Sequence, residues 1–152
     1  MVACASCSST RSSWQHPPVR GSPEEELLLA NQAFYDAFAS RDIEAMDELW
    51  ARGLPVACVH PGWPALYGRE EVISSWRSIL LGDSAPEVRC EQPQAAVFGD
   101  SGFVVCTERI EGRPLVATNY FVLQDGTWQI VHHQGGPMNA EVEPAPGDRT
   151  LN

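Results

Sequence analysis

The sequence has no lysine: its ten basic residues are all arginines, and twenty acidic residues bring the net charge to −10. Without lysine, Schiff-base chemistry is excluded. The acidic balance argues against DNA, RNA or an anionic membrane as a partner. No apolar run approaches the ~20 residues that a membrane-spanning helix needs. The net charge favours solubility and says nothing about the fold.

Cysteine is also sparse, with five residues in 152. Cys4 and Cys7 form a C-A-S-C motif that has no second pair, which is a weak signal for zinc or redox chemistry. Cys58, Cys90 and Cys106 lie in strand-like runs and are expected to be small buried apolar side chains. Free cysteines of this kind favour a reducing compartment, and we expect a cytoplasmic protein.

The length predicts one domain with two tails. Residues 1–22 contain no acidic residue and seven Ser or Thr, and we expect a disordered tail there. An organellar transit peptide is the alternative for this segment. Residues 138–152 are expected to form a second, acidic disordered tail. The folded domain is therefore predicted to span residues 23–137.

Hydrophobic periodicity predicts helices first and strands afterwards. One helix is expected to open at Pro23, a second to follow Asp42 and a third to span 69–81. A short strand is expected at 55–60, and the remaining predicted strands are 87–98, 103–111, 114–124 and 127–134. This order indicates an α+β fold. We expect a conical two-layer structure, with about three N-terminal helices packed on the concave face of a curved, mostly antiparallel sheet.

The last hairpin carries the most specific local signal. Asp125-Gly126 is a strong two-residue turn signal between alternating apolar runs, so it predicts a regular register. In that register Asn119 faces His132, at the polar end of an apolar face, and Phe121 faces Ile130 on the same side. His132 and His133 then point to opposite sides of the sheet.

Because side chains alternate along a strand, the same face can be followed across the turn onto the preceding strand. If the turn at 111–113 has an even number of loop residues, Cys106 and Glu108 lie on the same face as Asn119 and His132; a three-residue loop would reverse this. His60 precedes a stiff Pro-Gly-Trp-Pro loop, in which Trp63 is a candidate aromatic wall.

These side chains suit general acid–base chemistry in an apolar pocket. Glu108, His132 and His60 are the candidate catalytic residues, because a buried carboxyl has a raised pKa and histidine titrates near neutrality. The candidate substrate-binding residues are Asn119, Trp63, Phe121 and Cys106. The set would serve proton abstraction beside a carbonyl, cyclisation, dehydration or epoxide opening, with no cofactor and no metal.

Each candidate also has a plainer interpretation. Glu108 would point outward and pair with Arg109 or Arg113; His132 would be a structural histidine bonded to Asn119; and His60 would bond backbone at a strand end. Trp50, Trp63, Trp76 and Trp128 would be core anchors. A metal site with two histidines and one carboxylate is a further alternative, although no compact spacing motif supports it.

Several of these motifs together resemble the SnoaL-like type of nuclear transport factor 2-like proteins over about residues 24–137. The resemblance is carried by the segments Phe34-Tyr35-Asp36-Ala37-Phe38, Ala45-Met46, Leu49-Trp50, His60-Pro61-Gly62-Trp63, Ser75-Trp76, Cys106-Thr107-Glu108, Ala117-Thr118-Asn119 and Trp128-Gln129-Ile130-Val131-His132-His133. It implies a conical α+β barrel around an apolar cavity, often dimeric through the outer sheet face. The family contains isomerases, polyketide cyclases, dehydratases and domains without catalysis, so the fold alone does not choose the activity.

Two functions therefore stay open. One is a cofactor-free isomerase, cyclase or lyase acting on a small, largely apolar organic molecule; the other is a non-catalytic ligand-binding or dimerisation domain. The isomerases' Asp base with paired Tyr and Asp donors has no convincing match here. A homodimer is expected through the apolar outer face predicted for Phe103, Val105, Tyr120, Val122 and Val131.

Overall fold

The computed structural model describes residues 21–139. The two predicted tails, including the Cys4–Cys7 motif, lie outside the described residues apart from the few positions at each end. None of the helices in the described part of the chain has the length and apolar character that a bilayer crossing requires.

Three helices form, as the sequence predicts, and the first two begin at local capping signals. The helices are α1 (Pro23–Ser40), α2 (Ile43–Leu49) and α3 (Arg69–Leu80). Ser22 and Glu25 form a capping box at the start of α1, with Pro23 in the first turn. The Asp42 side chain accepts a hydrogen bond from the backbone N–H of Ala45 and so caps α2.

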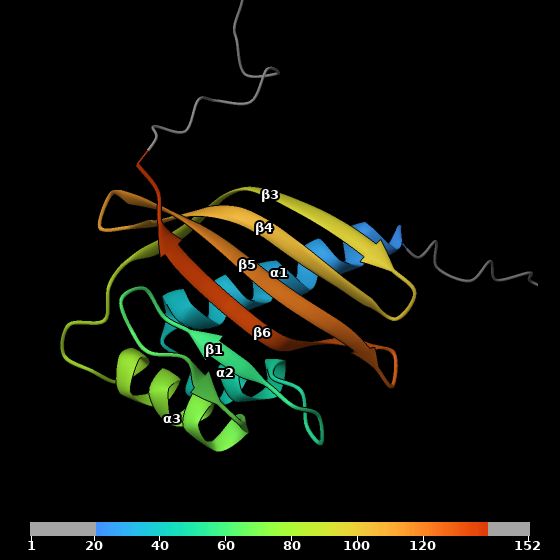
Figure 1. The fold of residues 1–152 in the computed structure, drawn as a ribbon, viewed down its shortest axis with the longest axis horizontal. Helices are drawn as coiled ribbons and strands as arrows, with labels where there is room; N and C mark the ends of the chain where they lie inside the picture. Colours follow the sequence, from blue (N-terminus) through green and yellow to red (C-terminus); the bar gives the residue numbers. More distant parts are fainter. Residues whose placement is uncertain (1–20, 140–152) are drawn as a thin grey trace, which may run out of the picture.

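Six strands form one open sheet in the order β2-β1-β6-β5-β4-β3 (Figure 1). The strands are β1 (Ala57–Val59), β2 (Leu66–Tyr67), β3 (Val88–Phe98), β4 (Ser101–Ile110), β5 (Arg113–Gln124) and β6 (Thr127–Pro137). The four C-terminal strands form the predicted antiparallel meander, whereas β1 runs parallel to β6. Because β2 has only two residues, no sequence periodicity could reveal it.

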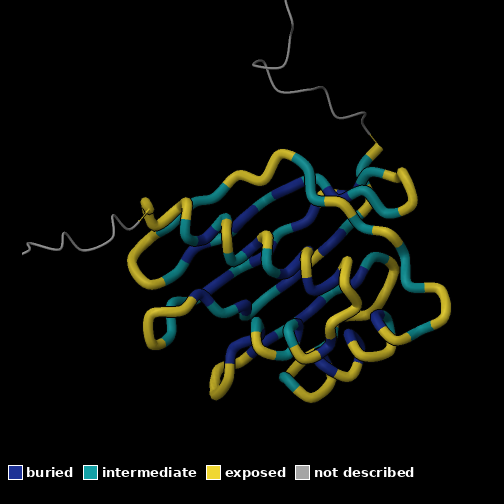
Figure 2. Tube along the Cα trace, turned by 180° about the vertical axis from the view of Figure 1, so that it is seen from behind, coloured by how far each residue is buried: buried dark blue, intermediate teal, exposed yellow. Residues whose placement is uncertain are grey.

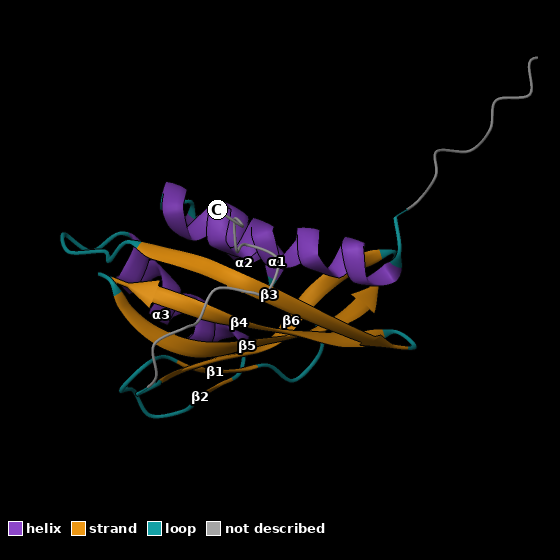
Figure 3. Ribbon diagram, turned by 90° about the horizontal axis from the view of Figure 1, so that it is seen from above, coloured by secondary structure: helices purple, strands orange, loops and turns teal. Residues whose placement is uncertain are grey.

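The helices lie against one face of the sheet and enclose the core (Figure 3). Helix α1 packs mainly along β3, while α3 packs beside β1 and β2. Burial alternates along β4 and β5, and the inward positions of both strands are dark in Figure 2. The expected α+β fold, with three helices on a curved, mostly antiparallel sheet, is confirmed, but the sheet is not closed into a barrel.

The turn between β4 and β5 has the even loop that the parity argument required. Ile110 pairs with Arg113, so Glu111 and Gly112 form a two-residue loop. Glu108 consequently points inward, on the same face as the buried Leu115 of β5. The alternative in which Glu108 faces outward and pairs with Arg109 or Arg113 is therefore wrong.

A β-bulge in β6 corrects the predicted hairpin register. The pairs next to the turn are as expected, up to Phe121 with Ile130, but the next pair is Tyr120 with His132. Val131 is thus an extra residue, and Asn119 pairs with His133 rather than with His132. His133 is buried on the helix side, while His132 is partly exposed on the outer side.

The bulge lies where β6 changes its neighbour on the other edge. Before it, Ile130 bridges to Trp50, and its carbonyl accepts a hydrogen bond from the N–H of Ala51. After it, β6 pairs with β1, beginning at Ala57 and His132. A two-residue turn fixes the register only near the turn, so the local sequence of the hairpin did not reveal this change of partner.

Candidate functional site

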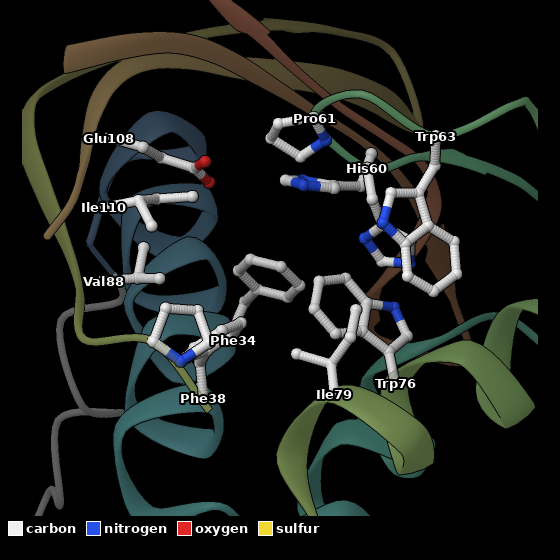
Figure 4. Close-up of a pocket in the computed structure, with 12 residues that line it drawn as sticks. Phe34, Phe38, His60, Pro61, Trp63, Trp76, Ile79, Val88, Glu108 and Ile110 are labelled. Carbon is white, nitrogen blue, oxygen red and sulfur yellow. The ribbon is translucent and has the colours of Figure 1, made fainter. Parts of the chain in front are cut away.

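A cavity of about 280 Å³ lies between α1, α3 and the inner face of the sheet (Figure 4). This volume is close to the lower limit of small-molecule sites, roughly 300–1,000 Å³. The residues that line it are Phe34, Phe38, His60, Pro61, Trp63, Trp76, Ile79, Pro86, Val88, Glu108, Ile110 and His133. Most of them are apolar or aromatic, and neither arginine nor lysine is among them.

The aromatic part of the wall is held together by edge contacts. The Trp76 ring lies 5.3 Å from the Phe34 ring and 4.6 Å from the His60 ring, both nearly perpendicular to it. Trp63 stands beside His60 at 5.1 Å and is 45% exposed, so it forms the rim of the cavity. The indole Nε1 of Trp76 is buried and has no hydrogen-bond partner.

Glu108 brings a carboxyl group into this apolar space. Its side chain is 3% exposed, and Tyr35 donates a hydrogen bond of 2.7 Å to its Oε1 atom. Burial raises the pKa of Glu108, although the bond from Tyr35 lowers it in part. Among residues 21–139, none of the salt bridges includes Glu108. Burial thus shifts the equilibrium of this carboxyl towards the protonated form.

Small residues on the neighbouring strands leave room for this carboxyl. A Cβ atom at Gly135 of β6 would lie 3.4 Å from Oε2 of Glu108 and 3.2 Å from Cγ of Pro61. Ala117, which pairs with Gly135, is the small residue of β5 at this level. In Figure 4, Glu108 points into the cavity from the side opposite Trp63 and Trp76.

His133 is the second polar group of the cavity wall. Its ring is 2% exposed, and its Nδ1 atom lies 2.6 Å from the Oδ1 atom of Asn119. Burial, and next the nearby His60 and His132, lower the pKa of His133 to about 3. The ring is thus neutral at physiological pH. Its Nε2 atom makes no hydrogen bond to the described residues. That atom is also not completely buried.

His60 is a third polar group, and it is also neutral. Its Nε2 atom lies 2.8 Å from the hydroxyl of Ser75, which donates its own proton to the carbonyl of Val72. Burial lowers the pKa of His60 to about 4. The cavity therefore offers one carboxyl group and two uncharged imidazoles.

The structure brings together only some of the predicted site residues. Glu108, His60 and Trp63 line the cavity. His132 does not: the bulge turns it to the outer face, where its Nδ1 atom lies 3.1 Å from the carbonyl of Ala57. The predicted bond between His132 and Asn119 is therefore wrong.

The other three predicted substrate-binding residues lie behind the cavity wall. Asn119 and Phe121 are completely buried, and Cys106 is nearly so. The Cys106 thiol contacts the hydroxyl of Tyr35 at 3.1 Å, and the Asn119 amide is occupied by His133 and Asn31. These groups support the lining residues and do not face the cavity.

Sequence reasoning missed His133, Trp76 and the role of Tyr35. A regular hairpin register predicts His133 on the outer face, and the bulge in β6 places it on the inner face. The hydroxyl of Tyr35 on α1 reaches β4 in a contact between residues 73 positions apart, which no local pattern encodes. The helical spacing did place Trp76 on α3, and its proximity to His60 was the missing information.

No group of three or more His, Cys, Asp or Glu side chains in the described part of the chain has an arrangement that could hold a metal ion. Two lining groups are of the kind that takes part in proton transfer: the Glu108 carboxyl, whose pKa is raised, and the neutral imidazole of His133.

The comparisons with known proteins agree with this architecture. Residues 28–140 match the SnoaL-like domain family. The chain belongs to this family. A candidate dehydratase of the NTF2-like family from Streptomyces avermitilis is 34% identical, and the match covers 77% of this chain and 96% of that protein, with a TM-score of 0.71. The SnoaL-like domain is thus a member of the NTF2-like superfamily.

Other relatives of this SnoaL-like domain have different names. A candidate calcium/calmodulin-dependent protein kinase type II association domain from Thiobacillus denitrificans is 28% identical, covering 81% of this chain and all of that one, with a TM-score of 0.66. The F-box protein SKIP8 of Arabidopsis thaliana is 26% identical over 114 residues, which are 74% of this chain. The match spans only 49% of that protein.

The burial of Glu108 generates a prediction about stability and pH. Because its pKa is raised in the folded state, the folded protein keeps a proton that the unfolded chain releases, so Glu108 costs stability as the pH rises above its ordinary pKa. We expect Glu108→Gln, which keeps an acceptor for Tyr35, to raise the urea midpoint more at about pH 7 than at about pH 5. The lowered pKa values of His60 and His133 make the folded protein more stable as the pH rises. This effect is the same in the native chain and in the Glu108→Gln variant.

Glu111→Gln is the matched control, because Glu111 is exposed in the turn that follows β4. It should change the urea midpoint by the same amount at both pH values. An equal effect of Glu108→Gln at the two pH values would show that the Glu108 carboxyl is ionised in the folded protein.

Proposed function

We propose that this SnoaL-like domain binds a small, uncharged, largely apolar organic molecule in the cavity and removes water from it by acid–base catalysis without a cofactor. One observation carries the proposal: a carboxyl whose pKa is raised by burial and a neutral imidazole line the same apolar cavity. The similarity to a candidate dehydratase at 34% identity supports it.

The proposed reaction assigns one role to each group. Nε2 of His133 removes a proton from the carbon beside a carbonyl, and Glu108 gives its proton to the hydroxyl that leaves from the next carbon. A carbon–carbon double bond and one water molecule result. The imidazolium of His133 then returns its proton to the Glu108 carboxylate through solvent, which restores both groups. Isomerisation or ring closure would use the same proton transfers without loss of water.

The alternative function is ligand binding without catalysis. The observation that favours it is the modest cavity, whose wall is dominated by aromatic side chains. The relatives named as a kinase association domain and as an F-box protein also fit this alternative. A dimerisation or binding domain would keep the cavity but would not need both Glu108 and His133.

The charge of the ligand is the first testable point. A carboxylate has no arginine or lysine to meet it among the lining residues, and burying an unpaired charge is costly. We expect β-naphthol to bind and β-naphthoate to bind at least about tenfold more weakly. The indole N–H signals of Trp63 and Trp76 in ¹H–¹⁵N spectra report binding, with Trp128 outside the cavity as the control. Equal binding of the two probes would contradict an uncharged ligand.

Catalysis is tested by two adjacent histidines on opposite faces. The substrate is the β-hydroxyketone formed from benzaldehyde and acetone, whose dehydration gives a conjugated enone that is followed by its absorbance. We expect His133→Phe or Glu108→Gln to lower the rate about 10²–10⁴-fold, as for the loss of a general base or acid. His132→Phe should leave the rate unchanged. Turnover that survives His133→Phe would contradict the role of His133 as the base, and absent turnover in a chain that binds β-naphthol favours the binding domain.

We also propose that two copies pair through the outer face of the sheet. Phe103, Val105, Tyr120 and Val122 lie on that face, opposite the buried positions of β4 and β5, and all are partly exposed. We expect a dimer in sedimentation velocity at about 100 μM, a concentration well above typical dissociation constants. Val105→Arg should give a monomer, whereas Leu29→Arg on the exposed side of α1 should not. A monomeric native chain would contradict this proposal.

A further inference from the structure

A chain of buried side chains leads from the cavity into the core. Asn119 of β5 takes the hydrogen from Nδ1 of His133 on its Oδ1 atom, at 2.6 Å, and donates its amide N–H to Oδ1 of Asn31 on α1, at 2.8 Å. The amide of Asn31 in turn lies 3.7 Å from the sulfur of Cys90. Both asparagines are at most 1% exposed, so water does not compete for these bonds.

The direction of these bonds determines the form of His133. Because Asn31 presents its oxygen, Asn119 must present its nitrogen to Asn31 and its oxygen to His133. An amide oxygen only accepts, so Nδ1 of His133 must carry the hydrogen. In a neutral ring the other nitrogen, Nε2, then has a free lone pair.

The second buried histidine has the opposite arrangement and serves as an internal comparison. The Ser75 hydroxyl gives its hydrogen to the carbonyl of Val72, so it must accept from Nε2 of His60. His60 therefore carries its hydrogen on Nε2. The two rings lie 6.4 Å apart, and their partners hold them in different tautomers.

We propose that Asn119, itself held by Asn31, is a positioning residue that fixes His133 in the Nδ1–H tautomer and so presents Nε2 as the base of the cavity. The inference deepens the proposed function, on which the role of His133 as a base rests. Asn119 never touches the ligand, because its amide is used on both sides. As an uncharged partner it fixes the ring without favouring its protonated form, as a carboxylate would.

Several titratable groups lie near His133. They affect its pKa in the same way in the native chain and in the variants at position 119. They are Glu108 from β4, which accepts the bond from Tyr35 of α1, Cys58 from β1, His60 from the following loop and the adjacent His132. A change confined to position 119 leaves these groups in place, so a shift in the titration of His133 reports its partner.

The test is ¹⁵N NMR of the full chain with labelled histidine, in which long-range couplings identify the tautomer. We expect His133 in the Nδ1–H form and His60 in the Nε2–H form, both neutral from about pH 5 to about pH 8, as lowered pKa values require. We expect Asn119→Asp to raise the titration midpoint of His133 by at least about one pH unit and to leave that of His60 in place. Ser75→Ala, the matched control, should change only His60.

Two results would overturn the proposal. One is an Nε2–H tautomer of His133 in the native chain, a measurement that needs no variant. The other is an Asn119→Asp variant in which His133 titrates as before. Should Asn119→Asp not fold, Asn31→Ser replaces it, and a single unchanged tautomer of His133 in that variant would contradict the role of Asn31. Binding of β-naphthol is measured separately, so failure of this inference and failure of the proposed function are distinguishable.

Discussion

One extra residue in β6 decides which histidine reaches the cavity. Without Val131 as a bulge, the regular hairpin would bring His132 to Asn119 and place His133 on the outer face; with it, His133 is buried and hydrogen-bonded to Asn119. At the bulge, the pairing partner of β6 changes from the segment at Trp50 to β1. The composition of the site thus depends on long-range strand pairing, because a shift of one residue exchanges the two faces of a strand.

This dependence explains what the sequence predicted and what it did not. The proline at position 23, the cap at Asp42 and the turn at Asp125-Gly126 are local signals, and they predicted the first two helices and the last hairpin of the meander. The inward position of Glu108 followed from the parity argument, because only the short turn at 111–113 separates its strand from β5. The predicted place of His132 required the ladder to continue past a change of partner, and Tyr35 required a contact across the whole domain, so neither followed from local pattern.

The cavity wall is largely apolar and holds no basic side chain, although the chain carries a net charge of −10. Its three titratable lining residues are all shifted towards their neutral forms, because burial penalises the ionised carboxyl and the protonated imidazoles alike. Since no basic side chain lines the space, an anionic ligand would have to leave water without a counter-charge. The same burial therefore sets both the chemistry of the groups and the kind of molecule that fits among them.

Burial also explains how an acid and a base can share one small space without reacting with each other. Transfer of the proton from Glu108 to His133 would create two buried charges, and their desolvation opposes this ion pair. Burial therefore favours the protonated carboxyl of Glu108, although the bond from Tyr35 opposes this, while Asn119 keeps the hydrogen of His133 on the far side of the ring. The two groups stay complementary at the same pH, and a bound molecule with a carbonyl and a leaving hydroxyl would supply the path that joins them.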